Sequence, residues 1–292
     1  MSVGVRYVLA AAVLFGTTGT AQALGPEDAH PLTVGAMRLV IGSVGLLLVA
    51  APGGHLRSAL AARRLWLFLG IVGVAGYQVT FFGGVRLAGV GVGTLLTIGS
   101  APVFTGIAAR LITGERPIRA WYPATGLALV GLLLIAQPGG TADPLGVVLA
   151  LTAGASYALF SVGSERVIAA SSPVAAMAVV FGGGAALLTP LLVVGEVGWV
   201  ASGPGLGSVL WLGLLATTLA YVLYAKGLAV TPVTTVATLV LAEPITALLA
   251  ATVVLSEPLA PSSVVGAAIV GVGLLILSRR SSAGHQAVNP TP

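Results

Sequence analysis

The chain has 292 residues, of which 57% are hydrophobic and 7% are charged, and its formal net charge is +5. Soluble domains carry about 25% charged residues, so this composition excludes an ordinary water-exposed fold and indicates a surface that faces lipid. The sequence contains no cysteine, which excludes disulfides, thiolate nucleophiles and cysteine metal sites. We expect no nucleic-acid partner either, because the basic residues lie in short connections between apolar runs and form no basic face.

Ten apolar runs are long enough, at roughly 20 residues each, to cross a bilayer as helices. They cover approximately residues 7–24, 31–51, 65–85, 88–112, 118–136, 145–164, 173–194, 208–227, 233–254 and 261–278. Short connections with glycine and proline, such as Gly25-Pro26, separate them. The sequence therefore predicts an all-α integral membrane protein with ten transmembrane helices.

The basic residues predict how these helices are oriented. With the N-terminus in the cytoplasm, nearly all of them fall in inner loops or at inner helix ends, from Arg6 to Arg280, and Arg86 alone falls outside. Positively charged loops of membrane proteins are retained in the cytoplasm. Both termini are therefore predicted to be cytoplasmic, in a multi-pass protein of the bacterial inner (plasma) membrane.

An internal repeat relates the two halves of the chain. Pro102 and Glu115 in and after the fourth span recur at identical spacing as Pro244 and Glu257 in and after the ninth. Each half holds five spans, and because five is odd, the halves are expected to be inverted relative to each other in the membrane. Inverted repeats are typical of alternating-access transporters with a substrate site near the membrane midplane.

The repeat sets the predicted domains. We expect a first five-helix repeat over residues 1–138, a second over 143–280, and a disordered cytoplasmic tail over 281–292. Glycines expected to mark close helix packing, within the chain or between two chains, are Gly126, Gly131, Gly266 and Gly271.

The order of several short motifs resembles the EamA-type branch of the drug/metabolite transporter superfamily. These motifs are Ala36-Met37-Arg38, the run from Phe81 through Ala88 to Pro102, Gly114-Glu115-Arg116-Pro117, Ala242-Glu243-Pro244 and Ser256-Glu257-Pro258. The resemblance covers essentially the whole chain. It implies a ten-helix fold and a secondary transporter, commonly an exporter of amino acids, related metabolites or drugs.

Two charged residues lie inside the predicted spans and away from the span ends. Glu243 lies near the middle of the ninth span, and Arg38 lies within the second. Charges at this depth need a partner or a water-filled cavity. Glu243 could carry a coupling proton and Arg38 could bind a substrate carboxylate. The alternative for each is structural, with Glu243 bonded to a neighbouring helix and Arg38 reaching the membrane surface.

Other side chains are candidates for the walls of a substrate site. Gln78 offers an amide donor and acceptor within its span, and Tyr157 and Tyr221 could line an amphipathic cavity. Tyr77 and Tyr224 are expected instead to pack at the membrane interface or against neighbouring helices.

The prolines and the two repeated acids have separate expected roles. Pro102 and Pro244 each remove a backbone donor from a helix, so they are candidates for bends that act as gates. Glu115 and Glu257 are expected to cap the helix that follows each of them.

These features favour a secondary active transporter that exports amino acids or related small metabolites by alternating access. The alternatives are a cationic drug or multidrug exporter and a non-transporting membrane scaffold. An enzyme is not expected, since no aspartate or histidine lies within the spans. No cofactor or metal is expected. The expected partners are a small-molecule substrate, the lipid bilayer and possible coupling protons. Proton coupling, facilitated diffusion and exchange remain open, as do monomer and homodimer.

Overall fold

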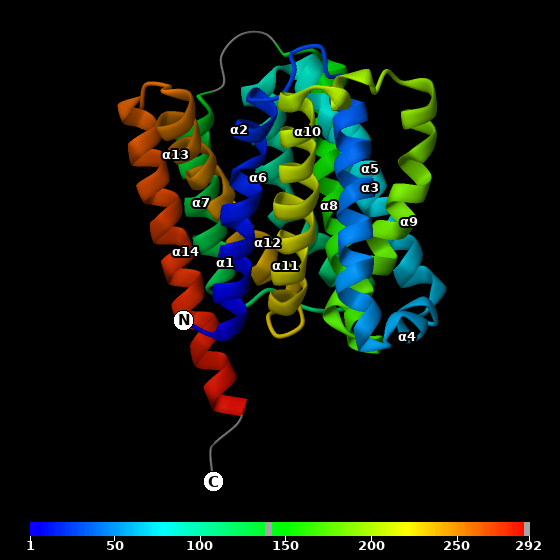
Figure 1. Cartoon of the computed structure of the whole chain (residues 1–292). Coiled ribbons are helices and arrows are strands. Elements are labelled where there is room, and N and C mark those ends of the chain that lie inside the picture. The colour runs from blue at the N-terminus through cyan, green and yellow to red at the C-terminus, as the bar shows by residue number, and fades with distance from the viewer. Residues whose placement is uncertain (138–141, 289–292) are drawn as a thin grey trace.

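The computed structural model describes residues 1–137 and 142–288, with backbone alone over 281–288, and over these residues it contains helices and no strand (Figure 1). Large apolar side chains cover the outside of the bundle, among them Leu111, Val194 and Val253, which are 78%, 83% and 79% exposed. Such a surface suits lipid and is unsuited to water. The prediction of an all-α membrane protein is confirmed.

Nine segments of the described chain are long and apolar enough to cross a membrane. In the first half they are Val3–Ala23, with α1 (Val3–Gly16) and α2 (Thr18–Ala23); Pro31–Gly53, with α3 (Pro31–Ala50) and η1 (Ala51–Gly53); α5 (Arg64–Ala88); and Val90–Thr113, with α6 (Val90–Ala108) and the π-helical η2 (Ala109–Thr113). In the second half they are α8 (Pro144–Ala170); α9 (Pro173–Val194); Gly203–Leu228, with α10 (Gly203–Leu210), the π-helical η4 (Trp211–Leu219) and α11 (Ala220–Leu228); Val233–Leu255, with α12 (Val233–Leu239), η5 (Val240–Ala242) and α13 (Glu243–Leu255); and Pro261–Arg280, within α14 (Pro261–Val288). The short α4 (Leu56–Leu60) and η3 (Gly198–Ala201) lie in connections.

The remaining apolar helix, α7 (Trp121–Ala136), is shorter than the others. It begins at Trp121, three residues later than the expected start of the span at 118, because Gly114 ends η2 in the left-handed conformation and the chain turns before α7. With 16 residues, α7 reaches roughly 24 Å, close to the thickness of the hydrocarbon core.

Local sequence sets where the helices begin. Proline occupies the first turn of α3, α8 and α9, where a missing backbone donor costs nothing. The side chains of Asp143 and Ser172 accept hydrogen bonds from Leu145 N and Ala175 N, and so cap α8 and α9. These signals explain why most predicted spans and observed helices begin close together.

The packing of the helices follows the two-fold relation between the halves. Two helices of the first half, α5 and α6, pack on α8, the first helix of the second half. In the same way, α11 and α13 of the second half pack on α1, the first helix of the first half. Two further contacts pair equivalent helices with each other, α3 with α9 and α7 with α14. The repeat found in the sequence is thus also a repeat of contacts.

The α7–α14 contact depends on two of the repeated glycines. A Cβ atom on Gly131 would lie 2.5 Å from the carbonyl oxygen of Gly266, and one on Gly266 would lie 2.5 Å from that of Gly131. Close packing within the chain is therefore observed for this pair. Gly126 and Gly271 have no atom within 4 Å of such a Cβ, so they do not pack within the chain.

The start of α1 and the end of α14 lie at the same end of the bundle as α4 (Figure 1), and we call this end the terminus side and the other the opposite side. The assignment of the terminus side to the cytoplasm stays a prediction. The last helix, α14, is described as helical to Val288, beyond the expected end of the second repeat at residue 280. The disordered tail stays a prediction, and its residues 289–292 lie outside the described residues.

Candidate functional site

The two repeated prolines behave differently in their helices. Pro102 lies inside α6, which continues to Ala108. Pro244 lies in the first turn of α13, directly after the 3-10 turn Val240–Ala242, so here the membrane segment is interrupted. Since proline has no backbone N–H, Pro102 cannot donate to the carbonyl of Ile98 and Pro244 cannot donate to that of Val240. The Val240 carbonyl instead accepts a hydrogen bond from the backbone N–H of Glu243 in the 3-10 turn. The expected break is observed at Pro244 only, and a gating role stays a prediction for both.

Ile98 and Val240 line the same internal cavity. The cavity lies between four membrane segments and leaves about 30 Å³ of space that a water-sized molecule can occupy. Its lining comes from α5, α6, α8 and the interrupted ninth segment, and consists of Tyr77, Thr97, Ile98, Ala101, Tyr157, Ala237, Val240, Leu241 and Glu243. Its lining, mostly apolar with a few polar groups, has the composition of a small-molecule site, and its volume is that of one or two water molecules.

Glu243 is the charged residue of the cavity wall and is half-buried. Within the described part of the chain its carboxyl group takes part in no ion pair. The charge of Arg38 is nevertheless close enough to act on it electrostatically. The predicted deep carboxyl group therefore faces a cavity instead of a fixed partner.

Arg38 is buried in α3, with 8% of its surface exposed, and its Nε has no hydrogen-bond partner. Arg38 and Glu243 both lie within electrostatic range of Tyr77 and Tyr221. Arg38 and Tyr221 thus lie near the cavity, although neither is part of its lining. A buried guanidinium with an unsatisfied donor is unusual in a protein interior and is expected at a functional position.

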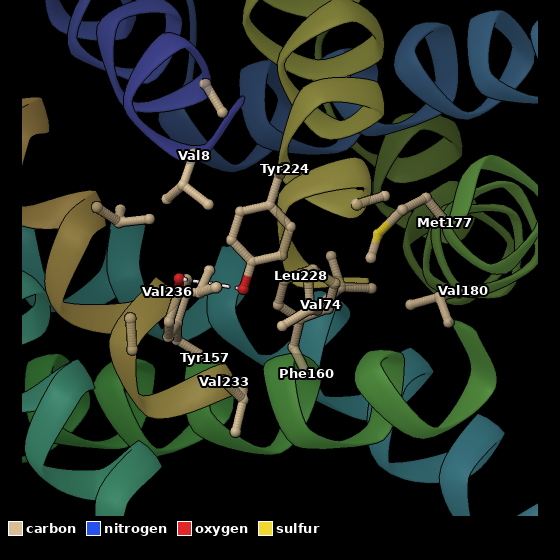
Figure 2. Close-up of a cluster of buried hydrophobic side chains, with 14 of the residues drawn as sticks. Val8, Val74, Tyr157, Phe160, Met177, Val180, Tyr224, Leu228, Val233 and Val236 are labelled. Atoms are coloured by element: carbon tan, nitrogen blue, oxygen red, sulfur yellow. Dashed lines mark hydrogen bonds between the residues drawn. The ribbon is translucent and has the colours of Figure 1, made fainter. Parts of the chain in front are cut away.

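A cluster of aromatic side chains adjoins the cavity (Figure 2). The Tyr157 hydroxyl is 3.3 Å from that of Tyr224, which is also hydrogen-bonded to Ser161 Oγ at 2.9 Å. The Tyr221 ring packs on Phe181, with 4.3 Å between ring centroids. Tyr157 lies in the cavity wall, and a role of Tyr157 in substrate binding stays a prediction. Tyr224 is fully buried and packs against neighbouring helices.

Tyr77 lies at the cavity although it was expected elsewhere, and Gln78 lies outside the cavity wall although it was a candidate for it. Tyr77, which was expected only to pack, lines the cavity and stacks on Phe81 with a centroid distance of 5.4 Å. Gln78 is buried in α5 and its Oε1 has no partner, but Gln78 is not part of the cavity wall.

Glu115 does not cap α7. The N-cap of α7 is Ala120, which makes no side-chain cap bond, and Glu115 Oε1 instead accepts a hydrogen bond from Arg166 Nη2 at 2.6 Å. The prediction failed because Arg166 lies far away in the sequence and offers a stronger, charged donor. No cap bond is observed for Glu257 among the described side chains.

Glu165 was missed by the sequence analysis. It lies in α8, one residue beyond the expected end of its span at 164, and its Oε1 accepts a hydrogen bond from Val233 N at 3.2 Å. Its Oε2 is buried without a partner. The apolar run Val167-Ile168-Ala169-Ala170 that follows was the available signal that the helix continues. No group of three or more metal-ligating side chains occurs among the described residues.

Comparison with known proteins gives a consistent result. The model of the EamA-like transporter family matches the chain twice, over residues 2–137 and 144–279. The uncharacterized transporter YwfM of Bacillus subtilis (strain 168) is 43% identical over 93% of this chain and 92% of its own length. The threonine/homoserine exporter RhtA of Escherichia coli (strain K12) is 31% identical over 87% of this chain and 83% of its own.

A probable terminal-alkyne amino-acid exporter of Streptantibioticus cattleyicolor is 28% identical over 84% of this chain and 82% of its own length. A solved crystal structure with 19% sequence identity superposes with a TM-score of 0.81, covering 96% of this chain and 98% of the other, which supports the fold alone. Both repeats of the family model are present, and they coincide with the two sets of helices that enclose the cavity. The chain belongs to the EamA-like transporter family.

Proposed function

We propose that this transporter exports amino acids or related small metabolites by alternating access. The observation that carries the proposal is the pair of opposite charges at the cavity: Glu243 in its wall and Arg38 buried nearby, without an ion pair between them. An amino acid carries the complementary pair of charges. Its ammonium group would lie against Glu243 and its carboxylate would be attracted by Arg38.

The lining of the cavity supports a small substrate. With about 30 Å³ of space the cavity holds no more than one or two water molecules, so its walls must move apart to admit even a small metabolite. The walls supply apolar side chains and the hydroxyl groups of Thr97 and Tyr157, a mixture that suits a short, partly polar side chain. Relatives named as exporters of threonine, homoserine and an amino acid agree with this class.

Glu243 also gives the cycle a possible proton carrier. A carboxyl group that faces a cavity can bind either a proton or the ammonium group of a substrate, and the two would exclude each other. We propose that this competition couples export to proton entry. As the substrate ammonium leaves, a hydronium ion that enters with water gives one proton to a Glu243 oxygen, so one O–H bond of the hydronium ion breaks as the carboxyl O–H bond forms.

The proposal is tested with purified protein in liposomes. Radiolabelled L-threonine and L-homoserine serve as probes, with an imposed pH gradient as the driving force. We expect gradient-driven accumulation that is abolished by a protonophore and inhibited by unlabelled probe. Accumulation equal to that of protein-free liposomes for these and the other common amino acids would overturn the amino-acid proposal.

A second candidate is a cationic drug exporter, and one observation favours it. Tyr77 and Tyr157 place aromatic rings in the same wall as the Glu243 carboxylate, an arrangement that attracts organic cations. The same liposomes separate the two functions, because a hydrophobic cation without a carboxylate would then be transported and would not require Arg38.

A further inference from the structure

Charged side chains join four membrane segments at the terminus side. Arg166, near the end of α8, donates from Nη2 to Glu115 Oε1 at 2.6 Å, and Glu115 directly follows the segment that contains α6. The Arg166 guanidinium also lies over the ring of Trp66 in α5, 5.9 Å from its centroid. The neighbouring Glu165 accepts a hydrogen bond from the backbone of Val233, the first residue of α12.

The four segments joined in this way are the same four that line the cavity. Tyr77 in α5, Ile98 in α6, Tyr157 in α8 and Ala237 in α12 each contribute to its wall. Along α8, Arg166 lies roughly 14 Å beyond Tyr157 toward the terminus side. The contacts of Arg166 and Glu165 therefore lie between the cavity and that side of the membrane.

The repeat makes a comparison with the opposite side possible. The offset that pairs Pro102 with Pro244 also pairs Glu115 with Glu257, but it pairs Arg166 with Leu24. Across the part of the chain that the structure describes, Arg166–Glu115 is the one ion pair between side chains. The opposite side thus has Glu257 as the equivalent of Glu115, but it has Leu24 in place of the arginine that would bind Glu257.

The opposite side also contains a hollow. Between the end of the first membrane segment, the start of α3 and α10 lies a pocket of about 60 Å³, whose wall includes Gln22, Trp199 and Ser208. The segments on either side are joined there by neutral contacts, such as Ser208 Oγ donating to the carbonyl oxygen of Ala21 at 2.8 Å. The two ends of the bundle are therefore closed by different means.

We propose that the Arg166–Glu115 ion pair is a gate latch, which holds the cavity closed toward the terminus side and must break for the cavity to open there. This inference rests on the proposed alternating-access function. The exposed fractions of the two side chains are 34% and 42%, so water can reach the pair and replace it during each cycle. Glu165 and Trp66 position Arg166 by joining its helix to α12 and α5.

The test measures access to the cavity without any substrate. The sequence contains no cysteine, so a single Ala101→Cys change places the one reactive thiol in the cavity wall. A charged maleimide that cannot cross lipid is added to membrane vesicles of either orientation, and a separate Ser58→Cys variant in the exposed α4 reports which side faces the reagent. We expect slow labelling of Ala101→Cys from the terminus side.

Breaking the latch should make labelling from the terminus side roughly fivefold faster in both Arg166→Gln and Glu115→Gln. This factor corresponds to the upper end of the free energy that a partly exposed ion pair contributes. The matched control is Arg116→Gln, which removes a positive charge from an exposed residue adjacent to Glu115. The exchange of Arg166→Glu with Glu115→Arg should restore slow labelling. If the exchanged protein does not fold, Arg166→Lys, which keeps the charge, should label more slowly than Arg166→Gln.

The latch is overturned if both neutral variants label at the wild-type rate from the terminus side, or if Arg116→Gln accelerates labelling equally. Failure of the exchange or of Arg166→Lys to slow labelling would also overturn it. Because no substrate is used, this result is independent of the transport assay. A chain with the expected labelling that moved no amino acid would contradict the proposed substrate class and leave the latch intact.

Discussion

Ala101 and Glu243 occupy equivalent positions in the two repeats, each directly before a proline, and both line the same cavity. Each repeat thus contributes the residue before its proline to the cavity wall, and only the second repeat contributes a charged side chain there. A difference of this kind between otherwise equivalent positions is expected where the substrate has two chemically different ends. The electrostatic influence of Arg38 on Glu243 adds the opposite charge from a different helix.

Replacement of Glu243 should uncouple transport from the pH gradient. In Glu243→Gln the side chain keeps its shape and loses its exchangeable carboxyl proton, so we expect gradient-driven accumulation of L-threonine to fall to the level of protein-free liposomes. The yield of folded protein should not change. The measurement is tracer accumulation in liposomes, with size-exclusion chromatography as the check on folding.

Glu257→Gln is the matched control for this prediction. Glu257 precedes a proline at the end of the same membrane segment, and it is exposed and remote from the cavity wall. Its replacement should leave accumulation unchanged. Full gradient-driven accumulation by Glu243→Gln would show that the coupling proton is carried elsewhere.

Arg38→Ala should weaken the binding of substrates that have a carboxylate. A charge-assisted hydrogen bond in a buried site contributes about 1.5–3 kcal/mol, which corresponds to at least a tenfold rise in KM for L-threonine. Decarboxylated analogues should lose far less affinity. Arg57→Ala in the exposed α4 removes the same charge outside the cavity and should have no effect on KM. Equal losses for amino acids and for their decarboxylated analogues would return Arg38 to a structural role.

Much of the fold was predictable because its determinants are local. The apolar runs and the prolines at helix starts are readable without any tertiary contact, and the repeat of Pro102 as Pro244 indicated the two-fold arrangement. The short helix α7 was placed correctly at its end but not at its start, since the turn after Gly114 depends on a left-handed backbone conformation.

The site was less predictable because it depends on contacts between distant segments. The sequence singled out Glu243 by its depth, but it could not reveal that Tyr77 faces the same cavity. It assigned Glu115 to a helix cap, since the competing partner Arg166 becomes its neighbour only in the folded bundle. Glu165 was missed because the predicted span ends at residue 164, where hydropathy declines at a charged pair although the helix continues to Ala170.

Gly131→Ala should destabilise the bundle. The added Cβ would approach the Gly266 carbonyl oxygen to 2.5 Å, and both atoms belong to rigid helix backbones, so α7 and α14 would have to separate. Overpacking of this kind costs about 1–3 kcal/mol. We expect a lower thermal unfolding temperature in detergent. Gly126→Ala lies in the same helix with no neighbouring atom within 4 Å, and should not lower it. Equal stability of the two variants would show that the helix contact is looser than described.

Tyr224→Phe should reduce stability and leave transport in place. Tyr224 is fully buried, and its hydroxyl is the shared hydrogen-bond partner of Ser161 and Tyr157 (Figure 2). The change keeps the ring contacts with Phe160 and Tyr221 and removes the hydroxyl alone. An unsatisfied buried partner costs about 1–3 kcal/mol, so the unfolding temperature should fall measurably.

Tyr122→Phe is the control, because the Tyr122 side chain is 59% exposed and its hydroxyl has no comparable buried partners among the described residues. It should unfold like the unmodified chain. Since Tyr157 lines the cavity through its own ring, Tyr224→Phe should change KM for L-threonine by less than about twofold, which is below 0.5 kcal/mol. A large change in KM at unchanged stability would instead assign the Tyr224 hydroxyl to the substrate site, and the Tyr157–Tyr224–Ser161 group would then belong to the transport pathway itself.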